Sequence, residues 1–160
     1  MTISVRAARP SDAEGIAQLT LQLGYDVDGA EVAARLARML ARPDHRFLVA
    51  ELDGRLVGCV HAIVWEFVET GACVVLSGLV VDRSLRGKGV GRTLLGKVEE
   101  WAMEQGCSVV RLWSSVGRSE AHRFYEQLGY SNVKSQHVFV KSLDPAHPGD
   151  FGRFVPRLDR

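Results

Sequence analysis

The sequence contains little cysteine, little proline, few aromatic residues and almost no net charge. Its 160 residues include 3 Cys and 5 Pro, 8% are aromatic, and 20 basic against 19 acidic residues leave a formal charge of +1. This near neutrality excludes an overall field that would attract nucleic acid or an anionic membrane. Apolar runs are too short for a membrane-spanning helix, and the N-terminal segment 1–8 has no apolar stretch long enough for a signal peptide.

The three cysteines are Cys59, Cys73 and Cys107, which lie in or beside apolar runs without a CxxC pair or a histidine at metal spacing. They are predicted to be small core residues in a reducing compartment, with no metal site. Because 46% of the residues are hydrophobic, one globular domain is expected, over residues 1–143. A tail rich in Pro and Gly follows at 144–160, where Phe151 and Phe154 are available for packing. We therefore expect a cytoplasmic protein.

Hydrophobic periodicity predicts alternating helices and strands. A capping box of Ser11 and Glu14 is predicted to start a first helix, and Asp28 with Glu31 a second. Asp53-Gly54 is typical of a two-residue hairpin turn between strands. The predicted strands are 3–6, 47–52, 56–67, 72–81, a buried 109–113 and a last strand 137–140; the predicted helices begin near 11, 28, 90 and 119.

The most informative segment is 86–91, Arg-Gly-Lys-Gly-Val-Gly, which lies between an apolar run and an amphipathic one. Glycines allow the backbone to approach a ligand closely, and the N–H groups of the next helix start have no internal partners. Such N–H groups and the helix dipole favour phosphate. The segment therefore predicts an anion cradle, with Arg86, Lys88 and Arg92 placed around it.

Two well-known phosphate loops do not fit this segment. The dinucleotide pattern GxGxxG would require glycine where the chain has Arg92 or Leu94. The P-loop pattern requires Gly-Lys-Ser/Thr, and neither Gly87-Lys88 nor Gly96-Lys97 is followed by a hydroxyl residue. Nucleotide hydrolysis is therefore disfavoured.

The segment resembles the coenzyme A loop of the GCN5-related N-acetyltransferases, Gln/Arg-x-x-Gly-x-Gly/Ala, at Arg86, Gly89 and Gly91. A second resemblance lies at 121–130, where a helix carries Tyr125 and stops at Leu-Gly-Tyr. Together the two motifs give a resemblance to this family that covers roughly residues 3 to 141. The implied fold is α/β, with a mixed, mostly antiparallel, twisted sheet flanked by helices.

The resemblance also implies a set of functional residues. Main-chain groups of the fourth strand would bind the pantetheine arm and polarise the thioester carbonyl, and the following loop would hold the pyrophosphate. Tyr125 would protonate the departing thiolate, since a phenol can donate a proton. The implied cofactor-binding residues are Leu79, Val80, Val81, Arg86, Gly87, Lys88, Gly89, Val90, Gly91, Arg92 and Tyr125.

Two positions depart from the family pattern. Many relatives have an acidic residue on the fourth strand where this chain has Ser77, so the direct base of those relatives is absent and another base or a water relay is needed. Glu66 is the predicted base, and Glu69, His61 and His122 are the other titratable candidates, each with a structural role as the alternative. Arg118 replaces an asparagine that caps the tyrosine helix in relatives, and arginine does not cap in that way.

The predicted function is transfer of acetyl from acetyl-coenzyme A to a primary amine, by direct attack in a ternary complex and without a metal. A small-molecule acceptor is favoured, and Trp65 is expected near its cleft. Acidic residues would attract a cationic amine there, namely Asp26, Asp28, Glu66 and Glu69. Protein or peptide amines, and a non-catalytic acyl-coenzyme A sensor, are the alternatives. Neither nucleic acid nor membrane is an expected partner, and a homodimer is left open.

Overall fold

The computed structural model describes residues 2–148 of the chain. The chain divides into two compact units, Met1–Trp113 and Ser114–Arg160. In the described part, no helix is both long enough and apolar enough to cross a membrane.

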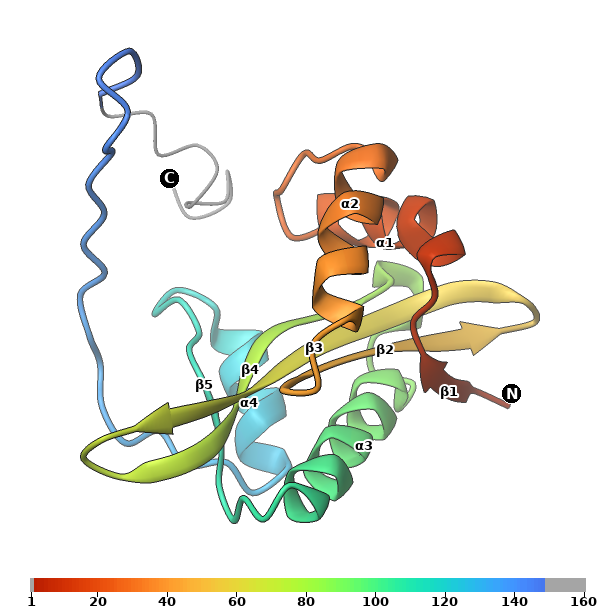
Figure 1. Ribbon diagram of the computed structural model, residues 1–160. Helices are drawn as coiled ribbons and strands as arrows, with labels where there is room; N and C mark the ends of the chain where they lie inside the picture. The colour runs from red at the N-terminus through yellow and green to blue at the C-terminus, as the bar shows by residue number, and fades with distance from the viewer. Residues whose placement is uncertain (1, 149–160) are drawn as a thin grey trace. The chain divides into compact units, whose positions relative to one another are not determined.

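The first unit contains a five-stranded sheet in the order β1-β2-β3-β4-β5 (Figure 1). Pairing is antiparallel from β1 to β4, and β4 pairs with β5 in parallel. The predicted mixed, mostly antiparallel sheet is thus confirmed. The strands are β1 Ser4–Ala7, β2 His45–Leu52, β3 Arg55–Phe67, β4 Gly71–Val81 and β5 Val110–Leu112.

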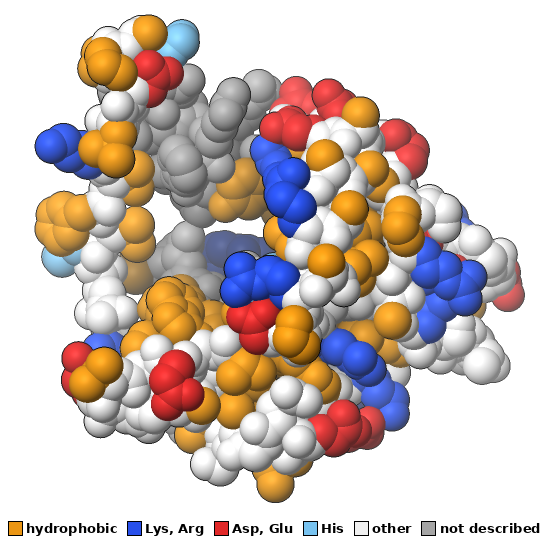
Figure 2. All heavy atoms as spheres, viewed as in Figure 1, with side chains coloured by type: hydrophobic (Ala, Val, Ile, Leu, Met, Phe, Trp, Pro, Cys, Tyr) orange, Lys and Arg blue, Asp and Glu red, His pale blue; other side chains and the backbone are white. Residues whose placement is uncertain are grey.

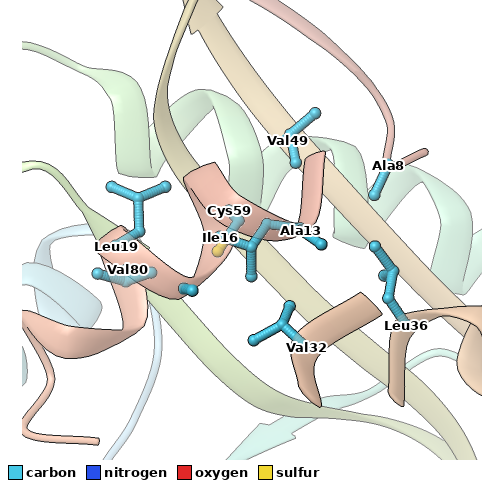
Figure 3. Close-up of a cluster of buried hydrophobic side chains, with 10 residues drawn as sticks. Ala8, Ala13, Ile16, Leu19, Val32, Leu36, Val49, Cys59 and Val80 are labelled. Carbon is cyan, nitrogen blue, oxygen red and sulfur yellow. The ribbon is translucent and has the colours of Figure 1, made fainter. Parts of the chain in front are cut away.

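Helices cover both faces of this sheet. Helices α1 (Ala13–Leu21) and α2 (Gly29–Leu40) lie on one face, and α3 (Val90–Glu104) lies on the other (Figure 1). Figure 3 shows the first layer, in which apolar side chains of α1 and α2 meet those of β2, β3 and β4. This cluster comprises Ala8, Ala13, Ile16, Ala17, Leu19, Val32, Leu36, Val49, Cys59 and Val80.

Helix α3 packs closely on the other face because β3 carries a glycine beneath it. A Cβ added to Gly58 would lie 3.0 Å from Leu94 Cδ1 and 3.1 Å from Val90 Cγ1. Gly58 and Cys59 point to opposite faces, as successive strand residues do. Trp101 is 4% exposed and packs in the core on the inner side of α3.

Several predicted element ends are confirmed by local geometry. Asp28 precedes α2, and its carboxylate accepts a hydrogen bond from the Glu31 N–H at 2.7 Å. In the β2–β3 turn, Asp53 and Gly54 have φ of 50° and 77°. Such left-handed backbone suits a two-residue hairpin loop.

The predicted capping box at the first helix is wrong. α1 begins at Ala13 after a short 3-10 helix, Pro10–Asp12. Asp12 Oδ2 accepts from the Arg9 N–H at 2.7 Å, and the same carboxylate pairs with Arg6 at 2.8 and 2.9 Å. This ion pair with β1 holds Asp12 at the helix start, and Arg6 also binds Glu51 of β2. A contact distant in sequence therefore overrides the local signal of Ser11.

Strand β5 is shorter and less buried than predicted. It spans three residues, and the flanking Val109 and Trp113 are 54% and 50% exposed. β5 is the last strand of the sheet, so one edge has no strand beside it within the described part of the chain. An edge position explains why this apolar run is not fully covered.

The second unit contains α4 (Ser119–Gln127), which stops before Gly129 at a φ of 90°, as predicted. The predicted strand 137–140 is wrong, because this segment forms no ladder and Val138 and Phe139 are 86% and 92% exposed. Strand propensity alone does not make a strand, since the backbone needs a hydrogen-bonding neighbour. The predicted packing of Phe151 and Phe154 lies outside the described residues.

The α1–α2 layer yields a prediction about stability. Leu36 is 2% exposed within the cluster of Figure 3, so Leu36→Ala should lower the free energy of unfolding by about 2 to 5 kcal/mol. Leu40→Ala, on the same helix at 38% exposure, is the matched control and should cost less than about 1 kcal/mol. Urea unfolding curves of both variants measure the difference, and equal losses would contradict the packing described here.

Candidate functional site

Strand β4 is paired on one side over its whole length and on the other over a short stretch. Its partners on β3 run from Phe67, opposite Gly71, to Gly58, opposite Val81. On the β5 side the ladder ends where Leu76 pairs with Leu112. From Ser77 onward, β4 therefore has an edge without a strand partner in the described part of the chain.

The direction of the backbone groups at this edge follows from one hydrogen bond. The Asp82 N–H donates to the Val57 carbonyl at 2.9 Å, so Asp82 faces β3. Since backbone groups alternate in direction along a strand, Val80 also faces β3, while Leu79 and Val81 face the open edge. The Val81 carbonyl accepts a hydrogen bond from Arg86 Nε at 3.4 Å, in agreement. Of the three predicted backbone positions, Leu79 and Val81 thus face the open edge, and Val80 faces β3.

The loop after β4 turns on two glycines. A 3-10 helix, Arg83–Leu85, leads to Gly87 and Gly89, whose φ values are 76° and 88°. A Cβ added to either glycine would meet no described atom within 4 Å. The glycines are therefore required by the left-handed backbone rather than by crowding within the chain. An ordinary residue in that region costs about 1 to 2 kcal/mol.

Helix α3 begins directly after this loop. The Gly89 carbonyl accepts the first helical bond, from the Thr93 N–H at 3.0 Å. The N–H groups of Val90, Gly91 and Arg92 precede that bond and have no partner within the helix. Glycine at the N-cap supplies no side chain to satisfy them. With the exposed cations of Arg86, Lys88 and Arg92 beside it, this helix start suits a polyanion.

Tyr125 lies on α4 in the second unit. Its ring makes edge contacts with Phe124 and Tyr130, at centroid distances of 5.1 and 5.8 Å. Burial raises the pKa of the phenol, and Arg118 opposes this more weakly. A raised pKa keeps the phenol protonated at neutral pH, which is the form that donates a proton.

Helix α4 also explains two other sequence observations. Arg118 is its N-cap and makes no side-chain cap, as its departure from the family pattern predicts. His122 Nε2 is hydrogen-bonded to the Ser115 carbonyl at 2.9 Å, which gives this histidine a structural role.

Glu66 is not close to the open edge of β4. It pairs with Ala72 at the other end of the strand, about 20 Å from Leu79 at roughly 3.3 Å per residue. Its neighbour Trp65 stacks on Phe67 at 5.0 Å and contacts Trp113 at 6.1 Å. Arg111 lies 5.4 Å above the rings of both Phe67 and Trp113. Trp65 thus belongs to an exposed aromatic cluster and is not beside Leu79.

A buried histidine is hydrogen-bonded to Ser77, where the open edge of β4 begins, and the sequence did not indicate this contact. His61 of β3 is 9% exposed, and its Nδ1 lies 2.7 Å from Ser77 Oγ. Its Nε2 lies 2.9 Å from Nδ1 of His45, which stacks on it, as does Phe47. Burial, followed by the charge of His45, lowers the pKa of His61 to about 4. The strand register that brings these residues together is not visible in their spacing.

The cysteines are buried and unpaired with one another, as predicted. Burial raises the pKa of the Cys59 thiol to about 12, so this thiol remains protonated at neutral pH. Among the described residues, no group of three or more His, Cys, Asp or Glu side chains is arranged to hold a metal ion.

Known proteins resemble the chain over most of its length. The model of the acetyltransferase (GNAT) family matches residues 14–130. The aminoglycoside N(6')-acetyltransferase type 1 of Stenotrophomonas maltophilia is 30% identical over 148 residues, which are 89% of this chain and 95% of that protein.

Solved structures agree with this assignment. Glucosamine-6-phosphate N-acetyltransferase from Arabidopsis thaliana superposes with a TM-score of 0.75 at 26% identity, over 90% of this chain and 100% of that one. AAC(6')-Iy in complex with the bisubstrate analogue CoA-S-monomethyl-acetylneamine gives a TM-score of 0.80 at 20% identity, over 89% and 99%, and supports the fold. The chain therefore belongs to the GNAT family and is an acetyl-coenzyme A-dependent N-acetyltransferase.

Proposed function

We propose that the protein acetylates a primary amine of a small cationic molecule by direct attack on acetyl-coenzyme A in a ternary complex. The observation that carries this proposal is the open edge of β4 leading into the uncapped start of α3. The similarity to an aminoglycoside N(6')-acetyltransferase over nearly its whole length supports a small-molecule acceptor.

The coenzyme would bind along β4 and the loop that follows it. The backbone groups of Leu79 and Val81 would pair with the pantetheine amides, and a Leu79 N–H bond would polarise the thioester carbonyl. The N–H groups from Gly89 to Arg92 would hold the pyrophosphate, helped by Arg86 and Lys88. Backbone donors suit this task because they are fixed before the ligand arrives.

The chemistry then requires two proton movements. An alkyl amine with a pKa near 10.4 is protonated at neutral pH, and forming the free base at pH 7 costs about 4.6 kcal/mol. The departing thiolate needs a proton donor, which the protonated phenol of Tyr125 would supply. The distance of Glu66 from the open edge disfavours its predicted role as the base.

The acidic residues predicted near the acceptor separate into two groups. Figure 2 shows acidic side chains gathered over the α1–α2 end of the first unit, where Asp28 caps α2. The Glu14 carboxylate lies beside Gly29 at the same place, where an added Cβ would clash with it. Glu66 and Glu69 lie instead at the β3–β4 turn. The first group would attract a polycationic acceptor, as an aminoglycoside is.

Acceptor-dependent release of free thiol from acetyl-coenzyme A tests this function directly. Neamine, glucosamine 6-phosphate and a lysine-containing peptide form an acceptor panel that separates small-molecule from protein amines. Turnover of the peptide alone would overturn the small-molecule proposal. Binding of acetyl-coenzyme A without thiol release from any amine would favour the sensor alternative.

The first site prediction concerns Gly89. Gly89→Val forces a branched side chain into a φ of 88° and should weaken acetyl-coenzyme A binding about tenfold or more in a folded protein. Gly96→Val, within α3 where an added Cβ meets no described atom within 4 Å, is the matched control. Titration calorimetry with acetyl-coenzyme A measures both, and unchanged affinity in Gly89→Val would exclude the loop as the binding site.

The second site prediction concerns Arg92. Arg92→Gln should raise the dissociation constant of acetyl-coenzyme A more at low salt than at high salt, because exposed charges are screened. Arg38→Gln removes an exposed charge from α2 and should leave affinity unchanged. A loss that is equal at all ionic strengths would indicate a structural role for Arg92.

The third site prediction concerns Tyr125. Tyr125→Phe keeps the ring and deletes the proton donor, so turnover should fall on the order of 10- to 1000-fold while coenzyme affinity is retained. Tyr130→Phe removes a hydroxyl from the neighbouring ring and controls for packing of the aromatic cluster. Steady-state kinetics and melting temperature decide the matter: lost stability with full turnover would leave Tyr125 as a packing residue.

A further inference from the structure

His61 is the one buried histidine among the described residues, and both of its ring nitrogens are hydrogen-bonded. Ser77 Oγ contacts Nδ1 at 2.7 Å, and His45 Nδ1 contacts Nε2 at 2.9 Å. Ser77 is exposed, His61 is 9% exposed and His45 is half-buried. The three side chains therefore form a chain that starts at the surface, passes through the interior and ends at a partly exposed ring.

The register places the start of this chain beside the open edge of β4. His61 pairs with Gly78 and Ala62 with Leu76, so Ser77 is the extra residue of a β-bulge. A bulge redirects a side chain and is common next to active sites. Ser77 lies two residues before Leu79, or roughly 6 to 7 Å along the strand. A Cβ added to Gly78 would meet no described atom within 4 Å, so space is open beside the hydroxyl.

We propose that Ser77 takes the proton from the acceptor ammonium and that His61 and His45 carry it to solvent. This rests on the proposed function, since it names the base for that reaction. Ser77 is then a catalytic residue that touches the amine, and His61 and His45 act through it. A hydroxyl linked to two imidazoles thus fulfils the role of a carboxylate base.

Four linked proton transfers carry the first ammonium proton to solvent. The ammonium N–H passes to Ser77 Oγ as the Ser77 hydroxyl proton passes to His61 Nδ1. At the same time the His61 Nε2 proton passes to His45 Nδ1, and His45 releases its Nε2 proton to solvent. The free amine attacks the thioester carbonyl, the C–N bond forms and the C–S bond breaks. Tyr125 protonates the departing coenzyme A sulfur, and the second proton of the attacking nitrogen restores the phenol.

This series of proton transfers never leaves a charge on His61. Its lowered pKa is therefore compatible with a relay, because the ring exchanges one tautomer for the other. His45 is the titratable group that lies against the ring and affects its pKa. Other titratable groups on the sheet face of His61 include Cys59, Cys73 and Arg111. Both thiols are buried, and the Arg111 guanidinium lies over the rings of Phe67 and Trp113. Helices α1 and α2 contribute apolar side chains to this face.

The pH dependence of kcat/KM for the amine tests the relay. Ser77→Ala should reduce kcat/KM about 10- to 100-fold at pH 7, and the loss should shrink to about threefold near pH 10, where roughly a quarter of an amine with a pKa near 10.4 is already neutral. Ser77→Thr keeps the hydroxyl and should restore most of the rate. His61→Gln should reproduce the pH signature of Ser77→Ala. Ser4→Ala, an exposed strand serine of β1, is the matched control.

Three outcomes would overturn the relay while the enzyme still turns over the panel amine. They are a loss in Ser77→Ala that is independent of pH, no rescue by Ser77→Thr, and the relay's pH signature in Glu66→Gln instead. If the wild-type protein acetylates no amine, the proposed function fails, and a second measurement judges the network separately. Nitrogen-15 spectra of the imidazoles should show His61 neutral down to about pH 5 and altered tautomer populations in Ser77→Ala. A His61 that titrates near pH 6.5 would exclude the network.

Discussion

The unequal pairing of β4 is the constraint on which the site depends. Its β3 side is hydrogen-bonded from Gly71 to Val81, whereas its β5 side is paired over Val74–Leu76 alone. Unpaired backbone groups in a sheet are normally a liability, because they invite another strand. Here they lie directly before a loop that suits phosphate, so a long, thin ligand with amides at one end and phosphates at the other matches them.

Packing fixes the two halves of that ligand site relative to one another. Gly58 lets α3 approach β3 closely, and Val90 and Leu94 at the start of α3 contact it. Val90, Leu94 and Leu95 are at most 1% exposed, so the start of α3 is anchored in the core. A rigid helix start beside a rigid strand edge is preorganised, which is what electrostatic binding of the cofactor requires.

Burial sets the protonation of the side chains assigned to proton transfer. It raises the pKa of Tyr125 and lowers that of His61, so both are neutral at neutral pH. A neutral phenol is a donor, and a neutral imidazole passes a proton from one nitrogen to the other. Burial thus shifts the pKa of the phenol and the pKa of the imidazole in opposite directions, because it disfavours the charged form of each group.

The sequence by itself determined the parts of the protein that depend on local chemistry. Gly87 and Gly89 are needed for positive φ, Asp28 and Asp53-Gly54 specify a cap and a turn, and apolar spacing marks α3 and its buried face. These signals, with the two motifs, were enough to predict the family, the mixed sheet and the anion-binding loop.

Tertiary structure decided everything that depends on register. Ser11 does not cap α1, because the Arg6–Asp12 ion pair holds Asp12 at the helix start. The segment 137–140 has no strand partner in the described part of the chain. Glu66 lies opposite Ala72, at the end of β4 far from Leu79. His45, His61 and Ser77 meet only because β2, β3 and a bulged β4 align, and cross-strand neighbours leave no trace in sequence spacing.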